Sequence, residues 1–198
     1  MPAEKENIRL EHFEITADDL YALSCGDVPG AYVRLRIDVE IMMTDTKMEW
    51  DTNKSFIRKS RGDILIGGLG LGMIVMAIQN KRTVTSITIV EKSQTVIDLV
   101  ASQLPLNHKV KVLQGDVFAY EPDSKFDMIY LDIWSEIDQE VFLKQMIPLK
   151  AKYSRYLKSN TGSNRGEVLC WAEKNARSGR PLATQDFSSI KLPVQGNQ

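Results

Sequence analysis

The sequence predicts an α/β protein whose doubly wound, mostly parallel β-sheet carries helices on both faces. Two observations lead to this prediction. Short apolar segments alternate with helical segments between residues 61 and 172, and the first apolar segment runs straight into a glycine cluster at residues 67–72. Apolar strands separated by helices are typical of parallel sheets, because the crossover helices cover both faces. We expect right-handed connections throughout.

Length and composition are those of one globular domain with a modest appendage. The chain has 198 residues, of which 43% are hydrophobic and 26% charged, and its net charge is −1. Such a chain can bury a core. Its charge attracts neither nucleic acid nor an anionic membrane, so we expect neither as a partner. The polar start predicts no signal peptide, and no apolar run is long enough for a membrane span.

Cysteine and histidine usage indicates a cytoplasmic protein with no metal site. Cys25 and Cys170 stand alone, without the spacing of a disulfide framework or a redox motif, which favours a reducing compartment. His12 and His108 have no neighbours at metal-ligand spacing, so no zinc site is expected.

The chain divides into three predicted regions. Residues 1–60 form a β-hairpin or cap region, in which Thr16 caps a short helix and residues 33–41 alternate as a half-buried strand does. Residues 41–45 either continue that strand or pair with it. Residues 61–175 are the ligand-binding α/β domain, and residues 176–198 are a C-terminal tail with at most one strand.

Within the α/β domain, the periodicity of each segment sets the expected elements. Strands are expected at residues 63–67, 86–91, 110–114, 126–132 and 168–172. Helices are expected at residues 71–79, 95–103 and 139–158.

Acidic side chains stand at the ends of three predicted strands. Glu91 ends the second strand, Asp116 follows the third, and Asp132 ends the fourth. Ligands of open parallel sheets bind beyond the carboxyl ends of the strands. Carboxylates gathered at that edge repel one another unless a ligand supplies donors. The plainer alternatives are that Glu91 is a surface charge and that Asp116 forms a turn after Gly115.

The spacing of the glycines narrows the class of ligand. Gly68, Gly70 and Gly72 read G-x-G-x-G, whereas the dinucleotide fingerprint needs a glycine at position 73, which is Met73 here. The loop also lacks the lysine of a P-loop, which disfavours ATP. A tight turn between strand and helix would explain the glycines alone, but not the acids that accompany them.

Four motifs together resemble a known family. They are Ile64–Gly72 (ILIGGLGLG), Thr88–Lys92 (TIVEK), Leu113–Phe118 (LQGDVF) and Phe126–Asp132 (FDMIYLD). The chain resembles class I S-adenosylmethionine-dependent methyltransferases, and within them the spermidine-synthase-like branch, whose N-terminal hairpin precedes the glycine loop. The resemblance implies a Rossmann-like sheet of the class I methyltransferase type.

The resemblance also implies S-adenosylmethionine as the cofactor. Glu91 would bind both ribose hydroxyls and Lys92 would lie beside the adenine. Asp116 would accept from the adenine amino group, with Val117 flanking the ring. The residues that would lie beside the methionine part of the cofactor are Gly68, Leu69, Gly70 and Gly72.

The acceptor end of the predicted site begins at Asp132. In the family this position lies near the transferred methyl group, and a carboxylate there could orient or deprotonate an acceptor amine. Trp134 lines the acceptor pocket, covers the sulfonium by a cation–π contact, or is simply a core aromatic residue. Further residues expected to shape this pocket are Asp45, Glu49, Trp50 and Asn53.

Departures from the family leave several functions open. Aminopropyltransferases carry a second acid where this chain has Ser135, and the tetrapeptide of nucleobase and amide methyltransferases is absent. The C-terminal sheet edge is expected to be shortened, which would let it pair with a second copy.

We expect a methyltransferase that acts on a small-molecule or otherwise unidentified acceptor. The alternatives are an aminopropyltransferase that uses decarboxylated S-adenosylmethionine and a catalytically silent binding or scaffold protein. Met73 and Asp116 disfavour a fourth reading, an NAD-dependent oxidoreductase.

Overall fold

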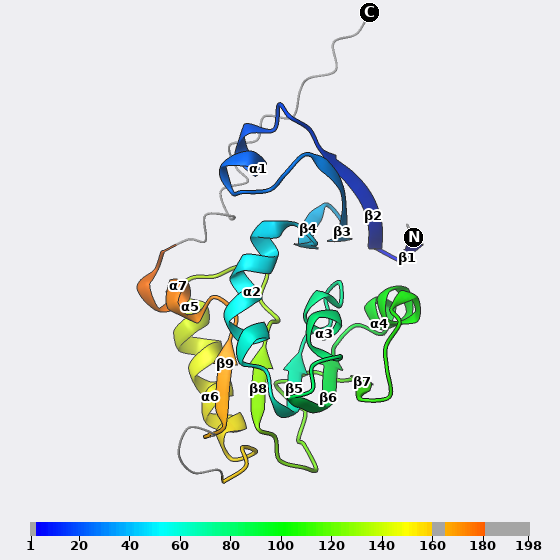
Figure 1. Ribbon diagram of the computed structural model, residues 1–198. Coiled ribbons are helices and arrows are strands. Elements are labelled where there is room, and N and C mark those ends of the chain that lie inside the picture. The colour runs from blue at the N-terminus through cyan, green and yellow to red at the C-terminus, as the bar shows by residue number, and fades with distance from the viewer. Residues whose placement is uncertain (1–2, 160–164, 181–198) are drawn as a thin grey trace, which may run out of the picture.

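The computed structural model describes residues 3–159 and 165–180 and contains two β-sheets (Figure 1). The larger sheet has five parallel strands in the order β7-β6-β5-β8-β9. The strands are β5 (Gly62–Gly67), β6 (Val84–Glu91), β7 (Val110–Gln114), β8 (Met128–Leu131) and β9 (Glu167–Cys170). The predicted α/β fold class is therefore confirmed.

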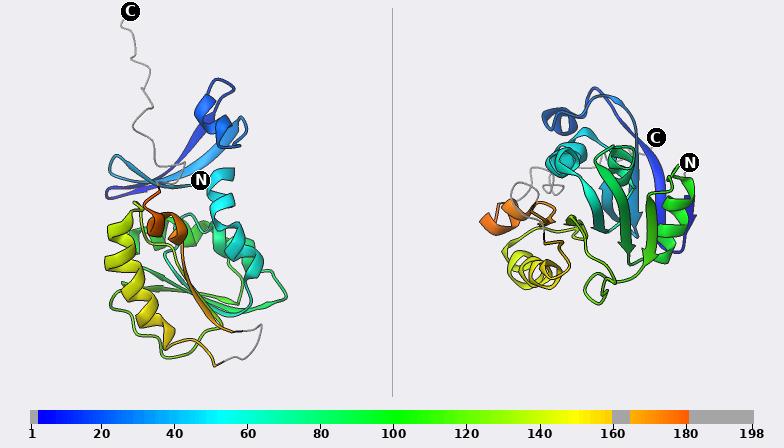
Figure 2. Two further views of the ribbon diagram at one scale, coloured as in Figure 1. Left: turned by 90° about the vertical axis from the view of Figure 1, so that its left-hand side faces the viewer. Right: turned by 60° about the horizontal axis from the view of Figure 1, so that its bottom comes forward.

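Helices cover both faces of this sheet (Figure 2). Helices α2 (Lys47–Lys59) and α3 (Met73–Ile78) lie on one face, and α6 (Ile147–Ser154) lies on the other. Helix α4 (Gln94–Val100), followed by the 3₁₀ turn η1 (Ala101–Gln103), joins β6 to β7. All four residues of β8 are buried, as expected for a central strand between two helical layers.

The predicted helix at residues 139–158 is divided into three segments. Helix α5 (Gln139–Val141) passes into a π-helical turn, η2 (Phe142–Met146), before α6 begins. Pro148 has no N–H for the carbonyl of Lys144, so the regular hydrogen-bond ladder cannot continue there. Helix α7 (Glu173–Ser178) follows β9, which ends at Cys170 rather than at residue 172.

The smaller sheet is antiparallel and lies above the carboxyl ends of the parallel strands (Figure 1). It comprises β1 (Ala3–Lys5), β2 (Ile8–Ile15), β3 (Gly30–Ile37) and β4 (Glu40–Thr44) in sequence order. The predicted hairpin is thus the β3–β4 part of a larger sheet. The strand predicted at residues 33–41 ends early, because Asp38, at φ 53°, begins a turn.

Two further N-terminal expectations need correction. The short helix α1 (Leu20–Ser24) is capped by Asp19 rather than Thr16, since the Asp19 carboxylate accepts from the N–H of Ala22 at 3.0 Å. Residues 47–59, which the sequence left without an element, form α2. This helix packs on the large sheet through Phe56, whose ring stacks on Tyr130 at 4.1 Å between centroids.

The C-terminal expectations are tested in part. In the described residues the sheet ends at β9, and the shortened C-terminal edge stays a prediction. Residues 181–198 of the predicted tail lie outside the described residues, and the boundaries of the three regions stay predictions. None of the helices in residues 3–159 and 165–180 is long and apolar enough to cross a membrane.

Candidate functional site

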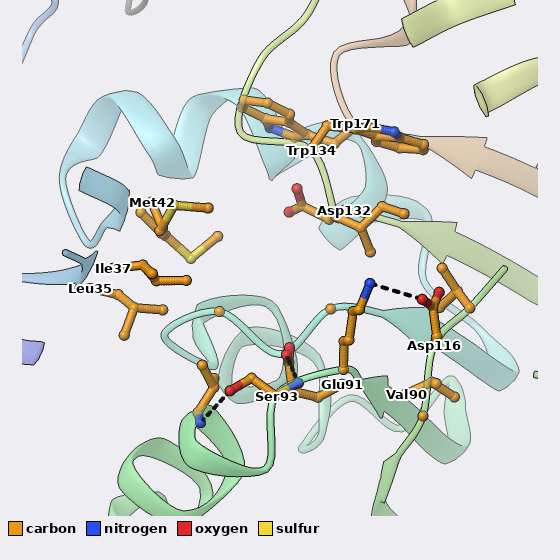
Figure 3. Close-up of a pocket in the computed structure, with 18 of the residues that line it drawn as sticks. Leu35, Ile37, Met42, Val90, Glu91, Ser93, Asp116, Asp132, Trp134 and Trp171 are labelled. Atoms are coloured by element: carbon orange, nitrogen blue, oxygen red, sulfur yellow. Dashed lines mark hydrogen bonds and ion pairs between the residues drawn. The ribbon is translucent and has the colours of Figure 1, made fainter. Parts of the chain in front are cut away.

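A cavity of about 340 Å³ lies between the two sheets, at the carboxyl ends of β5, β6 and β8 (Figure 3). Of the residues that the resemblance assigns to the cofactor, together with Asp132 and Trp134, all line it except Leu69 and Gly72. Of the four further residues expected to shape the acceptor pocket, Glu49 lines the cavity, and Asp45, Trp50 and Asn53 are not among its lining residues. Residues on its wall that carry the discussion below are Leu35, Ile37, Met42, Met43, Glu49, Gly68, Gly70, Glu91, Lys92, Asp116, Val117, Asp132, Trp134 and Trp171. Acids predicted from separate strands therefore share one cavity.

The glycine loop brings the ends of β5 and β8 together. Gly68 has φ 93°, and a Cβ there would lie 2.2 Å from the carbonyl oxygen of Asp132. Gly70 has φ 52°, and a Cβ there would lie 2.5 Å from the sulfur of Met43. Only glycine accepts both the left-handed conformation and the close neighbour. The loop therefore exposes backbone to the cavity at both positions.

Leu69 and Gly72 are not among the residues that line the cavity. Gly72 caps α3 with φ 75° and faces Leu104, whose Cδ1 would lie 2.1 Å from an added Cβ. Its glycine is required by the start of the helix rather than by a ligand. The Leu69 side chain is buried in the core, and only its backbone N–H approaches a site residue.

Glu91 links the glycine loop to the next strand. Its Oε2 accepts from the N–H of Leu69 and its Oε1 accepts from the N–H of Ser93, both at 2.8 Å. Each oxygen of a carboxylate can accept a second hydrogen bond. Glu91 is therefore held in place and still has acceptor capacity toward the cavity that it lines.

Asp116 and Lys92 form an ion pair on the cavity wall, with Nζ 3.0 Å from Oδ2. The N–H of Phe118 donates to Asp116 Oδ1 at 2.9 Å. This backbone hydrogen bond, with the Lys92 ammonium, lowers the pKa of Asp116. Next to it Val117 is buried, and its carbonyl accepts from the hydroxyl of Tyr153 at 2.9 Å. This end of the cavity offers an acid whose lowered pKa favours the ionised form, beside an apolar wall.

Asp132 and Glu49 form a second acidic group at another part of the wall. Burial raises the pKa of Asp132 to about 7, and its Oδ2 accepts no hydrogen bond from the described residues. Burial, reinforced by the charge of Asp132, raises the pKa of Glu49 to about 8. Figure 3 shows the Asp132 carboxylate inside the cavity.

The second acid comes from a place that the family pattern does not indicate. Ser135 is exposed and does not line the cavity, so an acid at that position would face solvent here. The acid that lines the cavity near Asp132 is Glu49, from α2. The sequence named Glu49 only among residues that shape the pocket, because no motif connects it with Asp132.

Two tryptophans form one wall of the cavity beside Asp132 (Figure 3). Trp134 donates from Nε1 to Oε1 of Gln145 at 2.8 Å, which fixes the indole of the predicted residue. Trp171 was not predicted, and it donates from Nε1 to Oγ1 of Thr52 at 3.0 Å. It lies inside the strand predicted at residues 168–172 and directly after the observed end of β9 at Cys170, and this place near the carboxyl end of a strand is the signal that could have identified it.

The opposite wall is apolar and comes from the smaller sheet. Leu35, Ile37 and Met42 face the cavity from β3 and β4 (Figure 3). Met43 joins the two sheets, since its sulfur accepts from the N–H of Leu71 at 3.2 Å. Among the residues that the structure describes, no group of three or more acidic, histidine or cysteine side chains is arranged to hold a metal ion.

Comparisons with known proteins find similar chains among solved structures. No protein-family model matches the chain, and no curated protein matches it. Similar solved structures include spermidine synthase from Thermotoga maritima (17% identity, TM-score 0.49, 80% of this chain and 52% of that chain). The N-methyltransferase NodS from Bradyrhizobium japonicum WM9, in complex with S-adenosyl-L-homocysteine, is 13% identical, with TM-score 0.48, 63% of this chain and 61% of that chain.

A third similar structure is the DhpI–SAM–HEP complex, at 18% identity and TM-score 0.44, with 55% of this chain and 49% of that chain covered. The matched part thus spans about half to three-fifths of these solved chains. Likeness at such identities concerns the fold alone.

Proposed function

We propose that this protein binds S-adenosylmethionine in the cavity and transfers its methyl group to an acceptor. The observation that carries the proposal is the convergence of Gly68, Glu91 and Asp116 on one cavity at the carboxyl edge of a parallel sheet. The glycine backbone at Gly68 suits the amino-acid part of this ligand, and the Glu91 carboxylate suits the ribose. Asp116, beside an apolar wall, suits the adenine.

The residues fit the cofactor by their hydrogen-bonding capacity. Glu91 keeps one acceptor site on each oxygen after bonding to two backbone N–H groups, which suits the two ribose hydroxyls. Asp116, with its lowered pKa, is an acceptor suited to an adenine amino group, and Val117 is suited to flank the ring. When bound, S-adenosylmethionine supplies a methyl group on a positively charged sulfur, so the protein mainly has to orient it.

An aminopropyltransferase that uses decarboxylated S-adenosylmethionine is the second candidate. The observation in its favour is Glu49, which provides near Asp132 the second acid that position 135 lacks. A catalytically silent binding protein is the third. Binding preference between the two cofactors and turnover separate these three candidates.

Two lesser expectations are also proposed. The two free cysteines, Cys25 and Cys170, favour the cytoplasm as the compartment. Strand β9 ends the sheet in the described residues, and pairing of this edge would produce a homo-oligomer. Analytical ultracentrifugation checks the second expectation, since a single monomeric species at all concentrations would contradict it.

The first experiment is calorimetric titration with S-adenosylmethionine and S-adenosylhomocysteine, with NAD and decarboxylated S-adenosylmethionine as controls. We expect selective binding of the first two ligands. Preference for decarboxylated S-adenosylmethionine would favour the aminopropyltransferase over the methyltransferase. If none of the four ligands binds, the scaffold protein is the remaining hypothesis.

The role of Glu91 needs a sharper test, because its loss also releases the glycine loop. We would compare 5′-methylthioadenosine with its 2′-deoxy analogue on the wild type and on Glu91→Gln. A carboxylate that accepts from the 2′-hydroxyl makes the wild type prefer the ribose by about 10-fold or more, and the variant should lose this preference. An equal preference in both proteins would show that Glu91 acts only on the loop.

A further inference from the structure

The acidic group formed by Glu49 and Asp132 is the part of the cavity that the proposed cofactor contacts leave unexplained. Glu91 and Asp116 each have hydrogen-bond donors within the protein. By contrast, the buried Oδ2 of Asp132 has no hydrogen-bond partner among the described residues. A buried acceptor without a donor costs free energy unless a ligand completes it.

The protein offers no cation to this pair in the described residues. Lys92 is the cation on the cavity wall, and it is paired with Asp116. Tyr130 interacts electrostatically with both acids, and burial raises its pKa, which keeps its hydroxyl neutral. Next to Tyr130, burial likewise raises the pKa of the Cys170 thiol. The two carboxyls therefore meet only neutral or acidic protein groups, a setting that favours a cationic ligand.

A buried polar contact fixes the two acids on their separate elements. The hydroxyl of Tyr130 donates to Oδ1 of Asn53 at 2.6 Å, and Asn53 is fully buried. Tyr130 precedes Asp132 by two residues, so both lie on the same face of the extended chain. Asn53 follows Glu49 by one helical turn and donates from Nδ2 to its carbonyl at 3.1 Å. The hydrogen bond between Tyr130 and Asn53 therefore fixes the position of Glu49 relative to Asp132.

We propose that Glu49 and Asp132 together bind the protonated nitrogen of the methyl acceptor, so that the acceptor is an amine. This inference rests on the proposed function and adds the acceptor class to it. An ammonium group has three donors, which suit two carboxyls that point into one cavity. Trp134 and the apolar wall of Leu35 and Ile37 suit a hydrocarbon part attached to that nitrogen.

The same pair can manage the proton that methylation displaces. The ammonium N–H bond breaks and the proton moves to the Asp132 carboxylate, while the nitrogen keeps the electron pair. That pair forms the new bond to the methyl carbon, and the electrons of the broken carbon–sulfur bond remain on the sulfur of the neutral thioether. The methylated product nitrogen carries the positive charge, so atoms and charge balance. Glu49 stays as the counter-charge and positions the amine.

The experiment compares n-butylamine with n-butanol, two probes that differ in the cationic nitrogen. Each is titrated calorimetrically into the protein alone and into the protein saturated with S-adenosylhomocysteine. We expect butylamine to bind at least about 10-fold more tightly than butanol, as a charge-assisted hydrogen bond implies. Binding of a cation lowers the pKa of both acids, so protons should be released near pH 7, which is seen as a dependence of the heat on the buffer.

Four variants make the test specific. Glu49→Gln and Asp132→Asn should each weaken butylamine binding at least about 10-fold and reduce proton release, with little effect on butanol. Glu14→Gln and Asp18→Asn make the same changes at exposed positions. These two variants should leave butylamine affinity and proton release unchanged. Thermal unfolding confirms that each variant is folded. The ratio of butylamine affinity to butanol affinity in the wild type tests the amine site without any variant.

Separate outcomes overturn this inference and the proposed function. Equal binding of the two probes, or an unchanged butylamine affinity in Glu49→Gln, overturns the amine site even if S-adenosylhomocysteine binds. Failure of S-adenosylhomocysteine to bind overturns the proposed function, while the preference of the protein alone for butylamine still decides whether the acid pair recognises an amine.

Discussion

The backbone N–H of Leu69 donates to Oε2 of Glu91 at 2.8 Å, and this bond ties the glycine loop to the end of the neighbouring strand. The same carboxylate also accepts from Ser93 at the start of α4. One side chain thus holds both helix-bearing loops that border the cavity. A change at Glu91 is therefore expected to alter the stability of the fold as well as the binding of any ligand.

Glu91→Ala should lower the free energy of unfolding by about 1–3 kcal/mol, because two backbone N–H groups lose their acceptor. Urea unfolding measures the change, and Glu14→Ala on an exposed strand position serves as the control. A stability equal to that of the wild type would mean that water replaces the carboxylate at no cost.

Gly70→Ala should be destabilising by about 1–3 kcal/mol, since alanine is strained at φ 52° and its Cβ would meet the sulfur of Met43 at 2.5 Å. Adding Met43→Ala removes the clash but not the backbone strain, so the double variant should recover about 1 kcal/mol relative to the sum. Gly30→Ala is the control, because the nearest neighbour of its Cβ is 3.8 Å away. Strict additivity would argue against the contact.

Tyr130→Phe should cost about 1–3 kcal/mol, because it leaves the buried Oδ1 of Asn53 without its donor. Tyr32→Phe, whose hydroxyl donates to the carbonyl of Val28 at the surface, should change stability by less than about 0.5 kcal/mol. If the two variants lose the same stability, the Tyr130 hydrogen bond is not specially protected from water.

Stability should depend on pH through Asp132 with a defined sign. Its folded pKa of about 7 lies above the ordinary aspartate value of 3.8, so the unfolded state binds fewer protons between these values. The free energy of unfolding therefore falls as pH rises through this window. Asp132→Asn removes the effect and should become more stable than the wild type by about 1–2 kcal/mol at pH 8.

Asp116 should contribute a pH dependence of the free energy of unfolding with the opposite sign, and Asp116→Asn tests this contribution. The pKa of Asp116 is lowered, so its contribution is present above the usual carboxyl range and is lost on acidification. We expect this variant to be less stable than the wild type at neutral pH. Chemical denaturation across pH 4–8 tests both variants, and a pH-independent difference for Asp132→Asn would contradict the assignment.

Lys158→Met should separate stability from ligand binding. Lys158 pairs with Asp63 at 2.5 Å and with Asp127 at 2.7 Å near the amino ends of β5 and β8, at the edge of the sheet opposite the cavity. Removing it leaves two carboxylates near each other and should cost about 1–2 kcal/mol. S-adenosylhomocysteine affinity, measured on folded protein, should not change. A parallel loss of affinity would mean that the two ends of the sheet are coupled.

The sequence was sufficient for the large sheet because its strands are short, continuous apolar runs. Their order then brings Glu91 and Asp132 to a common edge, as the topology of parallel sheets requires. Gly72, which was also expected beside the ligand, instead caps α3 and is not among the cavity residues, because a glycine repeat does not distinguish a position beside a ligand from the start of a helix. The functional roles of these residues stay predictions.

The acceptor end of the cavity was harder to predict, because it depends on contacts between distant segments. Helix α2 is polar as a whole, and one of its two buried residues is Asn53, so apolar periodicity alone does not identify the face that packs on the sheet. Glu49 reaches Asp132 only through the packing of that helix on β8. Trp171 likewise enters the cavity from the last described strand. The local periodicity of the sequence does not predict such tertiary contacts.

The cavity wall has two structural origins, which matters for how its specificity can change. Glu91 ends β6 and Asp116 follows β7 of the parallel sheet, whereas Leu35, Ile37 and Met42 come from the smaller sheet. Exchange of the β3–β4 hairpin for one with other side chains would therefore redesign the acceptor wall while the acids of the parallel sheet remain untouched. The architecture lends itself to modular engineering of one half of the cavity at a time.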